Sequence, residues 1–384
     1  MTDECAADVG QHIDRLADQL AATGALTRPH WRAALHAVPR HLFVPRAAWA
    51  NDAVVDRATS PQGWLDVVYS DVPLVTQLDE GGTDVRSGEG LYTSSCSAPG
   101  AVIDTLERLS PEPGDRVLEI GTGTGWTAAL LEWRAGRGTV TSVEIDPALL
   151  AQAAVSLEAA GYAPHLVNGD GAAGWPDGAP YDRVHSTCAV ARVPFEWVEQ
   201  CRPGGVLVTP YQPPFSDGHL VRLTVGRDGT AAGHCECGMN YMMMRSQRWP
   251  AADARAWVEH GPAQDTKSVT ATDPRLIGAA PAGASLAISA YAPGVMRVVG
   301  DDAVWLLDAL GPGSSWACAN YDRGTAGFEV QQCGPRRLWD ETETSFFRWL
   351  ALGSPGRDRF GLTVARGRQQ LWLDDPGNVL SPSG

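Results

Sequence analysis

One stretch of this 384-residue chain decides its fold: Val117-Leu118-Glu119-Ile120-Gly121-Thr122-Gly123-Thr124-Gly125-Trp126. An apolar segment that carries an acid runs directly into three glycines at alternate positions. Glycine tolerates positive φ and has no Cβ, so a ligand can lie against the backbone of such a loop. The helix that follows has free N–H groups in its first turn. We therefore predict a strand, a tight ligand-cradling turn and the start of a helix.

The spacing of these glycines distinguishes between nucleotide-like ligands. Dinucleotide-binding enzymes place a pyrophosphate at the helix start and space the loop as G-x-G-x-x-G. Here the spacing is G-x-G-x-G, and Glu119 precedes the loop. A carboxylate at that position repels a phosphate but attracts an ammonium group. The pattern therefore favours S-adenosyl-L-methionine over NAD as the cofactor.

A second acid, Glu144, ends the next predicted strand. It lies roughly 20 residues beyond the first glycine, where the ribose-binding carboxylate of such folds belongs. For the glycines alone, a turn that binds nothing is an equally good interpretation. The strand, the acid, the loop, the helix and the second acid together favour a cofactor site.

Composition narrows the class of protein. The chain is long enough for two domains, or for one Rossmann-type domain with large additions. No apolar run approaches the roughly 20 residues that span a membrane, and the first residues are acidic, unlike those of a signal peptide. We expect a soluble cytoplasmic protein without a membrane partner. A net charge of −15 argues against a nucleic-acid partner but is compatible with a peptide partner.

The eight cysteines are scattered and form no C-x-x-C pair. One cluster, His234-Cys235-Glu236-Cys237, contains residue types that bind metals, but its alternation fits a plain strand better. We expect no metal site and reduced thiols.

The region 99–248 alternates helices and strands. Helices are predicted at 100–109, 126–133 and 147–160, and strands at 116–120, 140–144, 165–168, 181–186 and 205–209. This alternation predicts an α/β fold with an open, mostly parallel Rossmann-like sheet that binds its ligand at the carboxyl ends of the strands. After Pro210 we expect strands at 219–225 and 231–235, joined as a hairpin, and an edge strand within 239–248.

The flanking regions are expected to recognise substrate. The N-terminal region, 1–98, is predicted to hold two helices between 9 and 37 and short strands at 67–71 and 73–76. The C-terminal region, 249–384, is predicted to be an α+β accessory domain.

Within this C-terminal region, 249–282 is expected to be a linker or irregular. Strands are predicted at 285–290, 296–299, 304–309, 360–364 and 370–373. Asp340 is expected to cap a helix, with Glu343 completing a capping box. Four tryptophans are candidates for contact with a peptide, but each is expected in the core instead, namely Trp305, Trp316, Trp339 and Trp372.

A serine-rich segment, Thr93-Ser94-Ser95-Cys96-Ser97-Ala98-Pro99, precedes the first helix of the region 99–248. By the rules of helix capping alone, Ser97 is the N-cap and Pro99 lies in the first turn.

The order of motifs around this segment matches a known pattern. The motifs are Phe43-Val44-Pro45, Tyr69-Ser70-Asp71, Ser97-Ala98-Pro99, Leu118-Glu119-Ile120-Gly121-Thr122-Gly123, Gly169-Asp170-Gly171, Ala179-Pro180-Tyr181-Asp182 and Pro203-Gly204-Gly205. Over about residues 31–211, the chain closely resembles the protein-L-isoaspartate O-methyltransferase family. The resemblance implies a class I methyltransferase sheet, S-adenosyl-L-methionine as cofactor and methyl transfer to a carboxylate.

The resemblance also implies roles for individual residues. Ser97 matches the active-site serine that contacts the substrate carboxylate and the cofactor. The cofactor-binding positions implied are Ser94, Ser95, Glu119, Gly121, Thr122, Gly123, Gly125, Glu144, Ile145, Asp170 and Gly171. We expect no general base, because a carboxylate is ionised at neutral pH and a sulfonium methyl is already activated.

The chain continues far beyond residue 211, whereas the isoaspartate repair enzymes generally end soon after the sheet. It resembles a long bacterial subgroup that matures ribosomally made peptides such as graspetides, lanthipeptides and lasso peptides. The segments that carry this resemblance are Trp31-Arg32, Val38-Pro39-Arg40-His41, the serine-rich loop Ser94–Ser97, Thr187-Cys188-Ala189-Val190 and 359–364. This resemblance implies methylation of an ordinary aspartate in a macrocyclic precursor peptide, already modified by a ring-forming enzyme. The ester then closes to an aspartimide. Hydrolysis would convert this imide to isoaspartate, whereas a constrained ring would retain it. Two alternatives stay open: an isoaspartyl protein-repair O-methyltransferase, and a cofactor-binding interaction module without catalysis.

Overall fold

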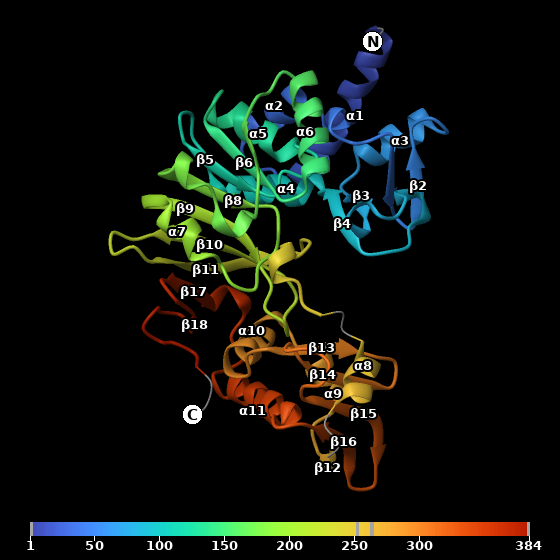
Figure 1. The fold of residues 1–384 in the computed structure, drawn as a ribbon, viewed down its shortest axis with the longest axis vertical. Helices are drawn as coiled ribbons and strands as arrows, with labels where there is room; N and C mark the ends of the chain where they lie inside the picture. Colours follow the sequence, from blue (N-terminus) through green and yellow to red (C-terminus); the bar gives the residue numbers. More distant parts are fainter. Residues whose placement is uncertain (1–2, 251–252, 262–264, 382–384) are drawn as a thin grey trace. The chain divides into compact units, whose positions relative to one another are not determined.

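The computed structural model describes residues 3–250, 253–261 and 265–381 (Figure 1). The chain forms two compact units. Unit 1 comprises Met1–Cys188, Pro194–Thr209 and Thr224–Gly229, and unit 2 comprises Ala189–Val193, Pro210–Leu223 and Thr230–Gly384. The division into functional regions 1–98, 99–248 and 249–384 stays a prediction.

Unit 1 begins with helices and a small antiparallel sheet. Its elements are α1 (Asp3–Ala22), α2 (Pro29–Ala37), η1 (Arg40–Leu42), β1 (Ala47–Ala50), β2 (Ala53–Asp56), α3 (Pro61–Val68), β3 (Leu74–Leu78) and β4 (Tyr92–Cys96). The sheet has the order β2-β1-β3-β4. The two predicted N-terminal helices and the strand that begins near 73 are confirmed.

The strand predicted at 67–71 is wrong, because α3 extends to Val68. Ser60 caps this helix by accepting a hydrogen bond from the N–H of Gly63, and Pro61 occupies its first turn. These start signals outweigh the strand preference of the two valines at its end.

The remainder of unit 1 is the predicted α/β sheet. Its elements are α4 (Pro99–Leu109), β5 (Val117–Ile120), α5 (Trp126–Ala135), β6 (Val140–Glu144), α6 (Pro147–Ala159), β7 (His165–Asn168), β8 (Tyr181–Ser186), α7 (Phe195–Glu199) and β9 (Cys201–Tyr211). The strands lie in the order β9-β8-β5-β6-β7. All four neighbouring pairs are parallel.

The central strand β5 has both β6 and β8 as neighbours, and every residue of β5 is buried. The chain leaves β5 toward β6 on one side, whereas β8 lies on the other side, so the strand order reverses at β5. Such a reversal creates a crevice at the carboxyl ends of the strands, where ligands of such folds bind. The glycine loop lies at this point.

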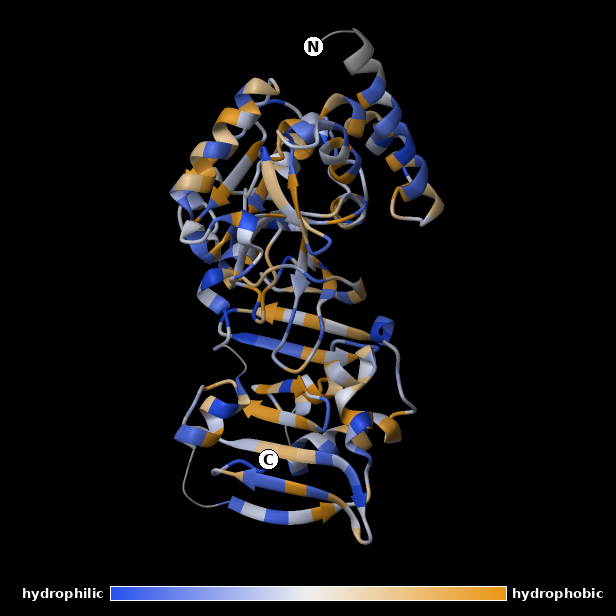
Figure 2. Ribbon diagram, turned by 90° about the vertical axis from the view of Figure 1, so that its right-hand side faces the viewer, coloured by the Kyte–Doolittle hydropathy of each residue, from blue (hydrophilic) through white to orange (hydrophobic). Residues whose placement is uncertain are grey.

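Unit 2 contains two antiparallel arrangements of strands. The first has the order β18-β17-β11-β10 and is formed by β10 (His219–Val225), β11 (Ala231–Gly238), β17 (Phe360–Ala365) and β18 (Arg368–Leu373). The second has the order β12-β16-β15-β14-β13 and is formed by β12 (Asp265–Thr270), β13 (Val295–Val299), β14 (Ala303–Asp308), β15 (Trp316–Gly324) and β16 (Gly327–Cys333). Figure 2 shows apolar and polar bands following one another along these strands, as one buried face requires.

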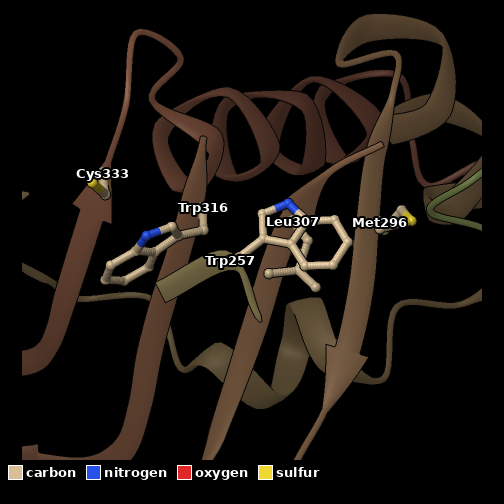
Figure 3. Packing of buried hydrophobic residues seen from close by; sticks show 5 residues of the cluster. All are labelled: Trp257, Met296, Leu307, Trp316 and Cys333. Atoms are coloured by element: carbon tan, nitrogen blue, oxygen red, sulfur yellow. The ribbon is translucent and has the colours of Figure 1, made fainter. Parts of the chain in front are cut away.

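Helices α8 (Ala254–His260), α9 (Pro274–Gly278) and α11 (Leu338–Ala351) pack on the second sheet. Helix α10 (Ala282–Tyr291) packs against α11 and β18. Trp257 of α8 is fully buried beside Leu307 and Trp316, and its Nε1 donates to the carbonyl of Asp308 at 3.2 Å (Figure 3). The tryptophans at 316, 339 and 372 are buried as predicted, whereas Trp305 is half-buried.

Several predictions for this region are wrong. Residues 249–282 contain α8, β12 and α9, and 285–290 lie in α10 rather than in a strand. The edge strand within 239–248 is reduced to a bridge between Met243 and Ala189. Helix α11 begins at Leu338, and its N-cap Arg337 makes no side-chain cap.

The two acids expected to form the capping box of α11 bind elsewhere. Asp340 accepts from Nε2 of Gln332 at 2.9 Å, and Glu343 accepts from Oγ1 of Thr270 at 2.5 Å. Tertiary hydrogen bonds to β16 and β12 therefore replace the local cap. Among the described residues, no helix has the length and apolarity to cross a membrane.

Candidate active site

The three glycines of the loop after β5 all adopt positive φ, with values of 90° at Gly121, 54° at Gly123 and 88° at Gly125. A Cβ on Gly121 would lie 2.4 Å from Oγ1 of Thr187 and 2.8 Å from Sγ of Cys188, so no side chain fits there. Around Gly123 the nearest atoms are 3.8 Å or more away. The loop is therefore closed on its inner side and open at its middle glycine, where a ligand can approach the backbone.

Glu119 is fully buried beneath this loop. The hydroxyl of Ser142, its register partner on β6, donates to Oε2 of Glu119 at 2.5 Å, and Thr122 lies 2.6 Å from the same hydroxyl. Its other oxygen, Oε1, has no hydrogen-bond partner among the described residues. Burial, with a smaller contribution from the charge of Glu144, raises the pKa of Glu119 to about 8.

A buried carboxylate with one free oxygen is a costly arrangement that a cationic partner relieves. The residues present therefore fit the ammonium end of S-adenosylmethionine, as the sequence predicts for Glu119. The role stays a prediction for this chain.

Glu144 connects the end of β6 to the glycine loop. Its Oε2 accepts from the N–H of Gly123 at 2.9 Å, and its Oε1 accepts from the N–H of Asp146 at 3.0 Å. Each oxygen keeps a second lone pair, which suits ribose hydroxyls. The next residue, Ile145, is 39% exposed although it is large and apolar. An exposed isoleucine beside this acid offers an apolar contact for an adenine ring.

Asp170 and Gly171 form a turn after β7. The side chain of Asp170 accepts from the N–H of Ala172 at 2.9 Å. Trp197 of α7 donates from Nε1 to the carbonyl of Gly171 at 2.8 Å, and a Cβ on Gly171 would lie 2.4 Å from Ile120. The turn is thus fixed against β5, and Asp170 itself is exposed.

The serine-rich segment meets the glycine loop. Ser94 is buried and accepts from Oγ1 of Thr76 at 3.3 Å, and its Oγ and the carbonyl of Ser95 are the atoms nearest to Gly123. Ser97 is half-buried, and its hydroxyl makes no hydrogen bond within the described part of the chain.

The expectation that Ser97 caps α4 is wrong. The N-cap position of α4 is Ala98, which has no side-chain cap. The N–H of Gly100 is instead bound by Oδ1 of Asp71 at 2.7 Å. Because a carboxylate from another segment satisfies this end of the helix, the Ser97 hydroxyl is left available.

Sequence reasoning missed the residues that hold these groups in place. They are Ser142, Asp146, Asn168, Thr187 and Trp197. Asn168 donates from Nδ2 to the carbonyl of Glu144 at 2.9 Å, and Thr187 donates to the carbonyl of Gly121 at 2.6 Å. The sequence offered two signals for such partners: Asn168 ends one predicted strand, and Thr187 directly follows another.

A parallel sheet with a G-x-G-x-G loop after its central strand and an acid at the end of the next strand fits the class I S-adenosylmethionine-dependent methyltransferases. A sequence profile described as protein-L-isoaspartate(D-aspartate) O-methyltransferase matches residues 11–248. The chain belongs to this family. The predicted fold class, cofactor and enzyme class are confirmed.

Individual relatives agree with this assignment. A protein-L-isoaspartate O-methyltransferase from Aeropyrum pernix is 36% identical over 203 residues, which is 52% of this chain and 66% of that protein. One from Anaeromyxobacter dehalogenans is 44% identical over 140 residues, which is 36% of this chain and 66% of that protein. The chain thus spans just under two thirds of the length of each.

A solved structure with the same name, protein-L-isoaspartate O-methyltransferase, shares the fold over 94% of this chain and 100% of its own, with a TM-score of 0.55 and 19% identity. That likeness includes most of unit 2. The fold of that solved structure therefore also includes a long C-terminal part.

Proposed function

We propose that this chain transfers a methyl group from S-adenosylmethionine to the free carboxylate of an isoaspartyl or D-aspartyl residue in a peptide or protein. The observation that carries the proposal is the family match over 11–248, which includes every residue of the candidate site. The free Oε1 of Glu119 gives that site one group for the cofactor, and the free hydroxyl of Ser97 gives it one group for the methyl acceptor.

When bound, S-adenosylmethionine supplies a methyl group that its sulfonium charge activates. The ionised Glu119 binds the ammonium end through Oε1 and keeps Oε2 on Ser142. Glu144 accepts hydrogen bonds from the ribose, and Ile145 covers one face of the base. The glycine loop contributes close approach of the backbone.

Ser97 orients the methyl acceptor. A substrate carboxylate is ionised at neutral pH and is itself the nucleophile, so no side chain has to remove a proton. The Ser97 hydroxyl donates to one carboxylate oxygen and leaves the other free to attack. Catalysis by this chain is therefore chiefly positioning, together with exclusion of water from the nucleophile.

An alternative with a more specific substrate is methylation of an ordinary aspartate in a macrocyclic precursor peptide, with closure to an aspartimide. The serine-rich loop and the motifs at 187–190 and 359–364 support it. The names of the matched relatives favour the isoaspartyl substrate. Both substrates would use the same groups of the site, so the choice between them is tested by which peptide is methylated.

Mass spectrometry of three peptides tests the proposal. One contains isoaspartate, the second is its linear aspartyl isomer, and the third carries a single aspartate in a macrocycle. We expect the first to gain a methyl group and then to lose methanol as the imide forms, while the other two stay unchanged. Methylation of the macrocycle alone would support peptide maturation, and no methylation of any peptide would support a non-catalytic binding module.

A further inference from the structure

Arg40 is almost completely buried in unit 1, with 1% of its surface exposed. Its guanidinium donates to carbonyl oxygens of two chain segments, 68–72 and 96–97. Nη1 donates to Val68 at 2.7 Å and Ser70 at 3.4 Å, and Nη2 donates to Val72 at 3.0 Å, Cys96 at 2.9 Å and Ser97 at 2.8 Å. The side chain therefore joins η1, the segment after α3 and the segment after β4.

This buried cation has no acidic partner. Among the described residues, no carboxylate lies within ion-pair distance of Arg40. Burying a charge is costly unless it is well hydrogen-bonded, so the main-chain carbonyls are what makes this arrangement tenable. The guanidinium also lies 5.4 Å from the ring of Trp126, the first residue of the helix after the glycine loop.

Arg40 also contacts the residue expected to orient the substrate. Two of the five carbonyls belong to Cys96 and Ser97. Three residues later, Oδ1 of Asp71 binds the N–H of Gly100 at 2.7 Å. A Cβ on Gly100 would lie 2.5 Å from Oδ2 of Asp71, so this approach requires glycine. The main chain is held on both sides of Ser97 while its hydroxyl is free.

We propose that Arg40 and Asp71 form a main-chain clamp that positions Ser97 for methyl transfer. The proposal rests on the proposed function for its catalytic part. Neither residue touches substrate, so both are positioning residues. A planar guanidinium can reach carbonyls of several segments at once, whereas the ammonium of lysine has three donors at one point.

Substitution of Arg40 by lysine keeps the charge and removes the planar fork. We expect Arg40→Lys to lower kcat about 10-fold or more, by loss of near-attack geometry, while KM for S-adenosylmethionine changes less than about twofold. Amide hydrogen exchange in the segment 92–101 should become faster. Leu35→Ala, which opens a buried site in the adjacent α2 without touching the clamp, is the matched control and should leave kcat and that exchange unchanged.

A double-mutant cycle separates positioning from general stability. If the clamp acts through Ser97, Arg40→Lys should lower kcat little further once Ser97 is alanine. Multiplication of the two single losses would overturn the proposal. So would unchanged exchange of 92–101 in Arg40→Lys.

A second variant and hydrogen exchange of the wild-type protein test the clamp where Arg40→Lys or the activity assay gives no result. If Arg40→Lys does not fold, Asp71→Ala should give the same faster exchange and lower kcat, and unchanged values there would overturn the clamp. If the wild-type protein methylates no isoaspartyl peptide, the proposed function fails, and hydrogen exchange alone then decides whether the clamp exists.

Discussion

The glycine loop and the serine-rich loop face the same site but are built in opposite ways. The glycine loop has its groups bound internally: Glu144 holds the N–H of Gly123, Thr187 holds the carbonyl of Gly121, and Oε1 of Glu119 beneath it has no partner among the described residues. The serine-rich loop has its main chain bound at Ser97 and Gly100, and its working side chain is free. In the proposed function, the first loop binds one invariant ligand, the cofactor, and the second presents a side chain to a variable peptide substrate.

Gly121→Ala is expected to have the largest effect on ligand binding, because it places a Cβ in the glycine loop. The left-handed φ and the 2.4 Å approach to Thr187 both oppose a Cβ. We expect binding of S-adenosylhomocysteine, measured by calorimetry, to weaken about 100-fold or more. Gly138→Ala is the control, since it has φ of 76° but nothing within 4 Å. Equal losses in the two variants would show that backbone strain alone, not the cradle, limits binding.

Ser97→Ala removes the free hydroxyl of the serine-rich loop. Loss of one hydrogen bond to a charged carboxylate should lower kcat about 10- to 100-fold. Binding of S-adenosylhomocysteine should stay close to the wild-type value, because the cofactor groups lie elsewhere. Calorimetry beside steady-state kinetics checks both, and a parallel loss of binding would break the division between the loops.

Glu119→Gln should have a smaller effect, about a 10-fold loss of cofactor affinity, because it removes a charge but keeps the shape. The pKa of about 8 means that the wild-type carboxyl is largely protonated at pH 7 in the free protein. Binding of an ammonium group then releases a proton, so affinity should rise as the pH increases from 6 towards 8. Calorimetry in buffers of different ionisation enthalpy measures that proton. Proton release that persists in Glu119→Gln would assign it to another group.

The same raised pKa has a consequence for stability. Because the folded state holds the proton of Glu119 more tightly than the unfolded state, the contribution of this group is complete below pH about 4.5 and is lost as the pH rises through about 8. Denaturant unfolding at several pH values should show this loss in the wild type and not in Glu119→Gln.

Trp257→Ala should have the smallest effect on catalysis, because Trp257 lies in unit 2 and both loops lie in unit 1. Removing this buried ring should destabilise unit 2 by about 3–5 kcal/mol. Methylation of a short isoaspartyl peptide should change less than about twofold, as expected for independent sites. A large loss of activity in protein that is still folded would give unit 2 a part in the chemistry.

The region around Glu119 was predictable from sequence because its signals are local. A strand buried on both faces reads as an apolar run, and glycines are required where φ is positive. The partners of these groups were not predictable, because Ser142 reaches Glu119 only through the register of parallel strands. Likewise, Asp71 takes the cap expected from Ser97 through a tertiary contact.

Unit 2 was harder to predict because its signals are short or ambiguous. The segment that becomes α10 alternates small and apolar residues, which suits a strand as well as a buried helix. The helices α8 and α9 are brief, and only their aspartate caps, Asp253 and Asp273, mark them in a proline-rich stretch. Helix α11 was predicted, but the acids assigned to its cap bind neighbouring strands.

The most direct test of the account is the ratio of kcat/KM for two linear peptides that differ only in having isoaspartate or aspartate at one position. The account predicts methyl transfer to the isoaspartyl peptide at least about 100-fold more efficiently, a difference of about 2.7 kcal/mol in transition-state binding. A ratio near one, or a preference for aspartate, would contradict it.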